Sequence, residues 1–114
     1  MLLIWTSVAK KADAERLAND AITLGLAACV QIDGPLLSVY RWKGQVERDE
    51  EFRLCFKCLP QQLSALEQHV LAHHPYKTPE WLVVRAEQVG EKYLSWAEAN
   101  STNPPPLTRR NHLL

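Results

Sequence analysis

Cysteine and glycine are scarce in this chain, and neither sign of charge is in excess. Its 114 residues hold three cysteines and four glycines, and 13 basic side chains balance 13 acidic ones. An odd and small number of cysteines is unlike the even sets of disulfide-stapled secreted domains, so we expect reduced thiols. The balanced charge lacks the basic excess of a general nucleic-acid binder. Four glycines leave no place for a phosphate loop of the usual kind.

Long hydrophobic runs are absent too. The apolar run that starts at Leu2 covers only a few residues and has no positive charge before it, which suits neither a signal peptide nor a membrane span. No G-x-S-x-G motif and no set of nucleophile, base and orienting group is present, so we expect no enzyme. We expect a soluble, cytoplasmic domain over residues 1–101. Residues 102–114, with three consecutive prolines, predict an extended or disordered tail.

The period of the apolar residues changes along the chain and predicts its elements. A short apolar run or strict alternation predicts strands at residues 2–8, 27–32 continuing after a bend as 36–43, 45–58, and 81–89. Steps of three and four residues predict helices at residues 12–24, 60–74 and 91–100. The order is β-α-β-β-α-β with one further helix. This is the α+β ferredoxin-like sandwich, in which an antiparallel sheet carries helices on one face.

The other face of the predicted sheet needs a partner. It includes aromatic and apolar residues from several strands, and a large exposed apolar patch usually marks an interaction surface. We therefore expect self-association of the chain. Neither a nucleic acid nor a membrane is expected as a partner.

Cys55 and Cys58 have the C-x-x-C spacing of a zinc knuckle or a redox pair. Side chains three apart on a strand point to opposite faces, so these two thiols cannot reach one metal ion or each other. We expect two unrelated strand cysteines, with Cys58 beside Leu54 and Phe56 on the helix-covered face of the sheet.

Histidines give two further candidates. His69 and His73 are four apart on a predicted helix, a spacing that can bring two imidazoles to one cation; a solvated helix face is the alternative. His74 opens the stretch HPYKTPE, in which two prolines fix a short connection beside a phenol, an ammonium and a carboxylate. Near a hairpin that carries Glu51 and Lys57, this loop suits a small polar ligand or a cation; a rigid connection is the alternative.

Five blocks of the sequence, in order, carry a resemblance to a known family. They are LAACVQI at 26–32, S-x-Y-x-W-x-G at 38–44, the pair of Glu51 with Lys57, HHPYKTPE at 73–80 and YLSW at 93–96. Together they resemble the CutA family of divalent-cation tolerance proteins. The resemblance implies a trimer similar in architecture to the PII signalling proteins, with sheets packed inward and clefts between subunits. It also implies tolerance and binding of copper or another divalent ion, without an established catalytic activity.

The resemblance implies site residues as well. Metal candidates are Cys29 and His74, with His73 and His69 as further imidazoles; the expected ion is Cu(II) or another divalent cation, and no organic cofactor is expected. A thiol with an imidazole suits copper, although a strand cysteine among small apolar residues also fits a buried hydrophobe. The residues expected to line the inter-subunit cleft are Tyr40, Trp42, Glu51, Lys57, Tyr76, Glu80 and Trp96.

Three functions follow from these observations. The first is a trimeric metal-responsive binding protein. The second is a sensor of a small metabolite that uses inter-subunit clefts in the PII manner. The third is a scaffold whose trimer is the function and whose proline-rich tail is offered to a partner.

Overall fold

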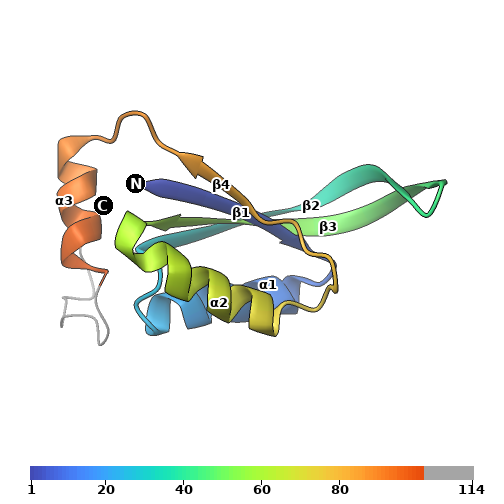
Figure 1. The fold of residues 1–114 in the computed structure, drawn as a ribbon, viewed down its shortest axis with the longest axis horizontal. Helices are drawn as coiled ribbons and strands as arrows, with labels where there is room; N and C mark the ends of the chain where they lie inside the picture. Colours follow the sequence, from blue (N-terminus) through green and yellow to red (C-terminus); the bar gives the residue numbers. More distant parts are fainter. Residues whose placement is uncertain (102–114) are drawn as a thin grey trace.

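The computed structural model describes residues 1–101, and within them the chain forms one antiparallel sheet of order β2-β3-β1-β4 with three α-helices (Figure 1). The strands are β1 (Leu2–Val8), β2 (Cys29–Trp42), β3 (Gln45–Cys58) and β4 (Leu82–Arg85). The helices are α1 (Lys11–Thr23), α2 (Leu63–His73), which follows a short 3-10 turn at Pro60–Gln62, and α3 (Glu91–Ala99). The predicted proline-rich tail lies outside the described residues.

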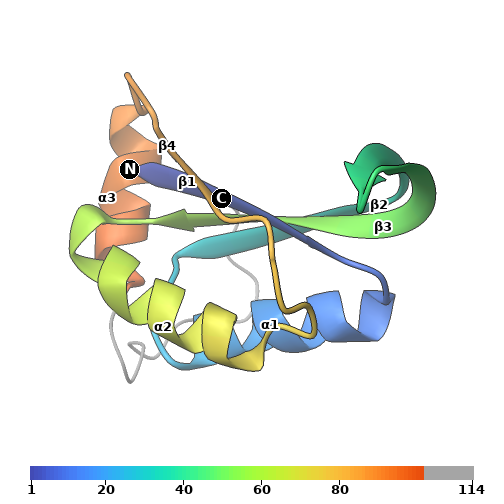
Figure 2. The ribbon, with the colours of Figure 1, turned by 45° about the vertical axis from the view of Figure 1, so that its right-hand side comes forward.

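Helices α1 and α2 lie side by side against one face of the sheet (Figures 1 and 2). The alternation of β1 explains this arrangement, because every second side chain from Leu2 to Val8 is buried while those between are only partly buried. Burial of this apolar stripe under the helices is the main stabilising contribution to the fold. The fully buried core residues are Ile4, Val8, Ala14, Leu17, Ala21, Leu54, Phe56, Cys58, Leu66 and Val70.

The predicted α+β ferredoxin-like order is confirmed, and so is the placement of Cys58 in the core beside Leu54 and Phe56. The prediction that the last strand runs to residue 89 is wrong. Strand β4 ends at Arg85, which pairs with Leu2 at the start of β1. The next amide, that of residue 86, donates to the Met1 carbonyl at 3.0 Å. The polar residues Glu87 and Gln88 follow, and the ladder between β1 and β4 does not continue through them.

The β2–β3 hairpin continues well past the two helices (Figure 1) and curls at its far end (Figure 2). A register shift between Asp33 and Leu36 introduces the bend that the sequence predicts there. Gly34 sits at this bulge with φ of +150°, and a Cβ atom on it would lie 2.8 Å from Phe52 Cδ1. The tip is a two-residue turn in which Lys43 (φ 50°) and Gly44 (φ 80°) both take left-handed conformations, as tight hairpins require.

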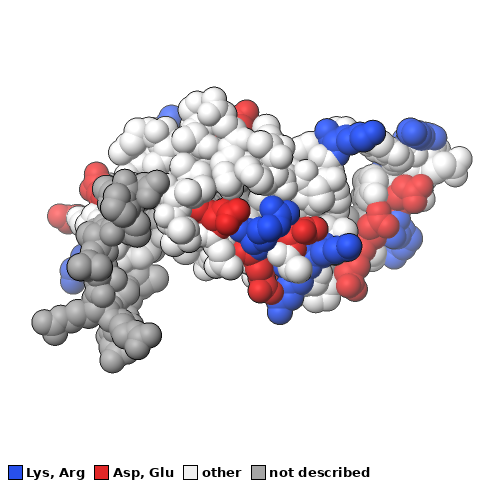
Figure 3. Space-filling model, turned by 90° about the horizontal axis from the view of Figure 1, so that it is seen from below, with Lys and Arg blue, Asp and Glu red and all other residues white. Residues whose placement is uncertain are grey.

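Several apolar side chains on the far hairpin and on β4 are exposed in the single chain. Those of the hairpin are Leu37, Val39, Trp42 and Val46, and those of β4 are Leu82, Val83 and Val84. The helical side differs, because Figure 3 shows Lys and Arg interspersed there with Asp and Glu and no broad patch of one sign. Within residues 1–101, no helix is long and apolar enough to cross a membrane.

Candidate functional site

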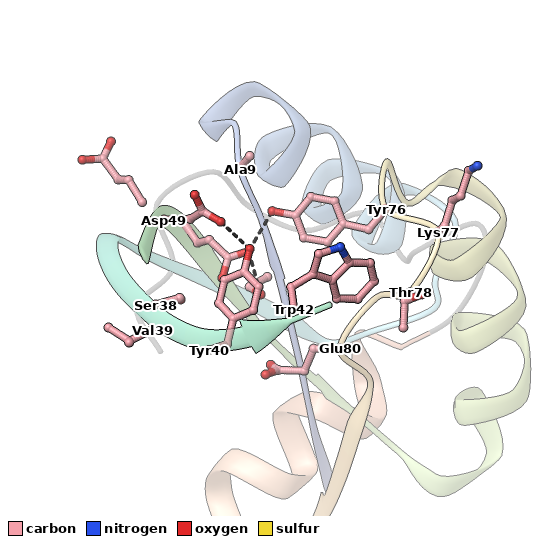
Figure 4. A pocket seen from close by; sticks show the side chains of 13 residues that line it. Ala9, Ser38, Val39, Tyr40, Trp42, Asp49, Tyr76, Lys77, Thr78 and Glu80 are labelled. Carbon is pink, nitrogen blue, oxygen red and sulfur yellow. Dashed lines mark hydrogen bonds between the residues drawn. The ribbon is translucent and has the colours of Figure 1, made fainter. Parts of the chain in front are cut away.

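A hollow of about 1020 Å³ lies between the curled hairpin and the loop that follows α2 (Figure 4). Three parts of the chain contribute to it: the end of β1, both strands of the hairpin and the loop. The lining residues are Ser7, Ala9, Ser38, Val39, Tyr40, Trp42, Asp49, Glu50, Glu51, Tyr76, Lys77, Thr78 and Glu80. A cavity of this size is at the upper end of those that hold small ligands.

A partly buried chain of hydrogen bonds fixes the loop over β1. The amide of Tyr76 donates to His74 Nδ1 at 3.1 Å, so the proton of the neutral imidazole is assigned to Nε2. Nε2 then donates to Thr6 Oγ1 at 3.0 Å, and the Thr6 hydroxyl donates to the Glu80 carbonyl at 2.6 Å. Thr6 is fully buried. The two bonds to Thr6 hold both ends of the loop, at residues 74 and 80, to one strand, and the bond within the loop orients the His74 ring.

Two phenols of the hollow are paired with carboxylates. Tyr40 donates its hydroxyl to Asp49 Oδ2, and Tyr76 donates to Glu51 Oε2 at 2.7 Å. Ser7 Oγ donates to the same Glu51 oxygen at 3.4 Å. The bond to Asp49 raises the pKa of Tyr40 to about 12. The pKa of Tyr76 is also raised, mainly by burial and secondly by the bond to Glu51. Both phenols therefore stay neutral at physiological pH, and the carboxylates carry the charge.

The hollow combines negative charge with aromatic surface. Its lining holds four carboxylates and one ammonium group, that of Lys77. In Figure 4 the rings of Tyr40, Trp42 and Tyr76 point toward one another, while Lys77 points away. A site of this composition favours a cation or a hydrogen-bond donor over an anion.

Comparison with known proteins assigns the chain to a family. A family model described as CutA1 divalent ion tolerance protein matches residues 2–100. The chain belongs to this CutA1 family. A divalent-cation tolerance protein CutA of Yersinia pestis (strain Pestoides F) is 34% identical over 99 residues, which are 87% of this chain and 83% of the relative. The chloroplastic Protein CutA 1 of rice is 39% identical over 101 residues, 89% of this chain but only 56% of the rice protein.

Solved structures of CutA proteins have the same fold. The structure of CutA from Xylella fastidiosa matches with a TM-score of 0.85 at 29% identity, covering 89% of this chain and 97% of that one. The structure of CutA1 from Oryza sativa matches with a TM-score of 0.82 at 34% identity, covering 94% of each chain. The family resemblance found in the sequence is confirmed. The chain spans about half the length of its two plant relatives, 56% of each.

In this CutA1-family chain, the hollow brings together five of the seven residues expected in the cleft. They are Tyr40, Trp42, Glu51, Tyr76 and Glu80. Lys57 and Trp96 lie elsewhere. Glu51 and Lys57 share a face of β3 but are six residues apart, which corresponds to about 20 Å. The Lys57 ammonium lies 5.7 Å from the centre of the Tyr93 ring, beside a smaller hollow of about 280 Å³. Trp96 is on α3, at the end of the sheet opposite the hairpin tip (Figure 1).

The predicted metal-binding imidazoles do not converge. His74 already uses both ring nitrogens to hold the loop. His69 and His73 stack on α2 with ring centres 4.2 Å apart, but each has its own partner: His69 Nε2 lies 3.4 Å from Asp20 Oδ2, and His73 Nδ1 donates to the His69 carbonyl at 2.8 Å. Among residues 1–101, no three His, Cys, Asp or Glu side chains are grouped so that they could hold a metal ion.

Cys29 lies far from these imidazoles. It pairs with Lys57 across the β2–β3 ladder, on the face of the sheet that α1 and α2 leave open. Burial and the neighbouring Cys29 raise the pKa of Tyr93. Cys29 is partly exposed and, like Cys55 and Cys58, is a free thiol. A single chain therefore offers this thiol to a metal without an imidazole beside it.

Sequence reasoning missed Thr6 and Asp49. Asp49 is two residues before Glu51, so the alternation of β3 already placed both carboxylates on one face. Pairing with Ser38 then brings Asp49 within reach of the Tyr40 phenol. Thr6 gave no such signal, because a threonine in a buried strand is common and its partners lie 68 and 74 residues away in the sequence.

Proposed function

We propose that this chain is a divalent-cation tolerance protein that acts by binding a metal ion, with Cu(II) as the first candidate, and that it is not an enzyme. The match of the CutA1 family model over residues 2–100 is the observation that carries this proposal. Relatives such as the Yersinia pestis protein bear the name of divalent-cation tolerance proteins. The imidazole nearest the hollow, that of His74, has both nitrogens engaged in holding the loop, which leaves it unsuited to act as a general base.

The working form in this proposal is a homotrimer with the sheets packed inward, as in PII signalling proteins. The exposed apolar residues of β4 and the far hairpin support association. The scattered ligands support it as well. One chain groups no three donors within residues 1–101, so a metal site built from these residues needs donors from more than one copy. Cys29, partly exposed on the open face of the sheet, is the thiol that such packing would bring near another chain.

The cytoplasm is the proposed location of the protein. Its three cysteines are all free, which agrees with a reducing compartment. The names of two plant relatives place those proteins in the chloroplast. Fractionation of cells that carry the native gene, followed by immunoblotting, would separate the two locations.

Copper titration tests the metal function. Calorimetry on the full chain is expected to show saturable Cu(II) binding that weakens by about tenfold or more in Cys29→Ser, because loss of one of the few ligands removes a main part of the affinity. Glu98→Gln, which alters an exposed carboxylate on α3 outside the candidate site, is the control and should bind as the wild type does. Millimolar binding that Cys29→Ser leaves unchanged would refute a specific site at this thiol. Light scattering tests the trimer. A stable monomer in solution would overturn the proposal of a metal site shared between copies of the chain.

A second function is a PII-like sensor that binds a small molecule in the hollow. The observation in its favour is the combination of a large hollow with paired phenols and carboxylates. A thermal-shift screen of charged and neutral metabolites tests it, because a ligand at about 100 times its dissociation constant adds roughly 2.7 kcal/mol of stability. A screen without any shift would argue against a sensor of this kind.

A further inference from the structure

We propose that the hollow between the hairpin and the loop binds an organic cation, a primary ammonium or guanidinium group carried on a short chain. The inference rests on the sensor function proposed above, because it names the class of that small ligand. It concerns a site separate from Cys29, so it does not depend on the binding of copper. The argument comes from the charge of the hollow, its aromatic surface and its remaining hydrogen-bond acceptors.

The charge of the hollow selects the sign of the ligand. Asp49, Glu50, Glu51 and Glu80 line it against the single ammonium of Lys77. Lys77 is exposed and points away in Figure 4, so it neutralises little of this charge. Low-dielectric walls around one sign of charge concentrate counter-ions and charged ligands of the other sign. An anion such as a nucleotide phosphate would be repelled here.

The aromatic surface provides the second feature of a cation site. The rings of Tyr40, Trp42 and Tyr76 line the same hollow from β2 and from the loop. In the single chain, Tyr40 is 42% exposed and Trp42 is 50% exposed. Ring faces attract a cation through their quadrupole, and also cover the methylene groups that carry it.

The acceptors of the hollow are only partly used by the protein. Both hydrogen bonds to Glu51, from Tyr76 and Ser7, fall on Oε2. The bond to Asp49 from Tyr40 falls on Oδ2. An ionised carboxylate has about four acceptor sites on its two oxygens, so both residues keep acceptors for an N–H donor. Ammonium and guanidinium groups supply several such donors, and their bonds to carboxylates are among the stronger ones in proteins.

A metal ion fits these residues less well than an organic cation does. Within the described part of the chain, the carboxylates of the hollow are not grouped in the threes that a metal site would need. The volume of about 1020 Å³ is also far larger than an ion requires. Aromatic walls contribute nothing to the coordination of a hard cation, which takes oxygen ligands. They contribute directly to the binding of an alkylammonium chain.

Three probes with the same four-carbon chain test the proposal: 1,4-diaminobutane, 1,4-butanediol and succinate. Calorimetry on the full chain at low salt is expected to show saturable binding of the diamine and no binding of the diol or the dianion. Glu51→Gln keeps an acceptor for the Tyr76 hydroxyl while removing the charge, and should weaken diamine binding by about tenfold or more. Asp49→Asn is a second variant with the same expectation.

Glu98→Gln is the matched control, since this exposed residue on α3 lies at the other end of the molecule and changes the net charge equally. If Glu98→Gln weakens diamine binding as much as Glu51→Gln does, the binding reflects general charge attraction and the proposal is overturned. Binding of the diol or of succinate as tightly as the diamine would also overturn it, while leaving the sensor function in place. Failure of the diamine to bind at 10 mM or below, about the upper limit of specific recognition, overturns it as well. If no compound binds in a broader screen of small molecules, the proposed sensor function is overturned too.

Discussion

Replacing Thr6 with valine tests how the loop over the hollow is held. Valine has nearly the shape of threonine, so Thr6→Val leaves no cavity and removes only the hydroxyl. Two partly buried groups then lose their partner: the Nε2–H group of His74, whose nitrogen lies 3.0 Å from Thr6 Oγ1 in the wild type, and the carbonyl of Glu80, at 2.6 Å. Leaving a buried donor or acceptor unpaired costs about 1–3 kcal/mol. Because the partners are only partly buried, we expect a total loss near the low end, about 2–4 kcal/mol.

Thermal unfolding followed by circular dichroism, at one fixed protein concentration, measures this loss. For a domain of this size the midpoint should fall by roughly 10–20 °C. The control is Thr78→Val, which makes the same change at an exposed threonine in the same loop and should leave the midpoint within about 2 °C, as surface substitutions do. A Thr6→Val midpoint equal to that of the control would refute the view that these bonds fix the loop.

Two further predictions concern pH and the bulge. Burial lowers the pKa of His74 below its usual 6.5, so as pH falls the unfolded chain takes the proton first. The contribution of the neutral imidazole to the free energy of unfolding is therefore fully present above pH 6.5. It declines below that pH, by at most about 1.4 kcal/mol per pH unit. Urea unfolding at pH 7 and pH 5 should show a lower free energy of unfolding at pH 5, and the difference should be smaller in His74→Gln. An equal difference in the wild type and the variant would contradict this prediction. Gly34→Ala forces a Cβ to within 2.8 Å of Phe52 Cδ1 and should cost about 1–3 kcal/mol, whereas Gly90→Ala, with open space around it, should be nearly neutral in the same assay.

The regular elements of the core follow from local patterns that survive in the fold. The short apolar run over residues 2–8 predicts a strand and the steps of three and four over 12–24 predict a helix, and the buried residues of both elements meet in the core. The end of β4 did not follow from pattern, because it depends on how far the ladder with β1 continues. Residues 86–89 include the polar Glu87 and Gln88, and the ladder between β1 and β4 ends at Arg85.

The hollow was only partly accessible to sequence reasoning. The family blocks pointed to Tyr76 and Glu51, and these two meet in a hydrogen bond across 25 residues of sequence. What no pattern supplies is the curl of the hairpin, which depends on the bulge at Gly34 and decides which residues face the loop. The same blocks grouped Lys57 with Glu51. The fold separates them, because a straight strand keeps residues six apart on one face but about 20 Å from each other.

The far half of the hairpin contributes almost nothing to the folding of the single chain. Leu37 and Val46 are 61% and 64% exposed, so exchanging either for threonine should leave the unfolding of an isolated chain unchanged. A mutational scan that reads out folding alone would score this stretch as freely replaceable. Intolerance found at Leu37 or Val46 in a living cell, since neither residue lines the hollow, would therefore report contact with another surface. Leu37 and Val46 thus differ from the core residues, because substitutions at them affect association and not folding. The two effects can therefore be measured separately.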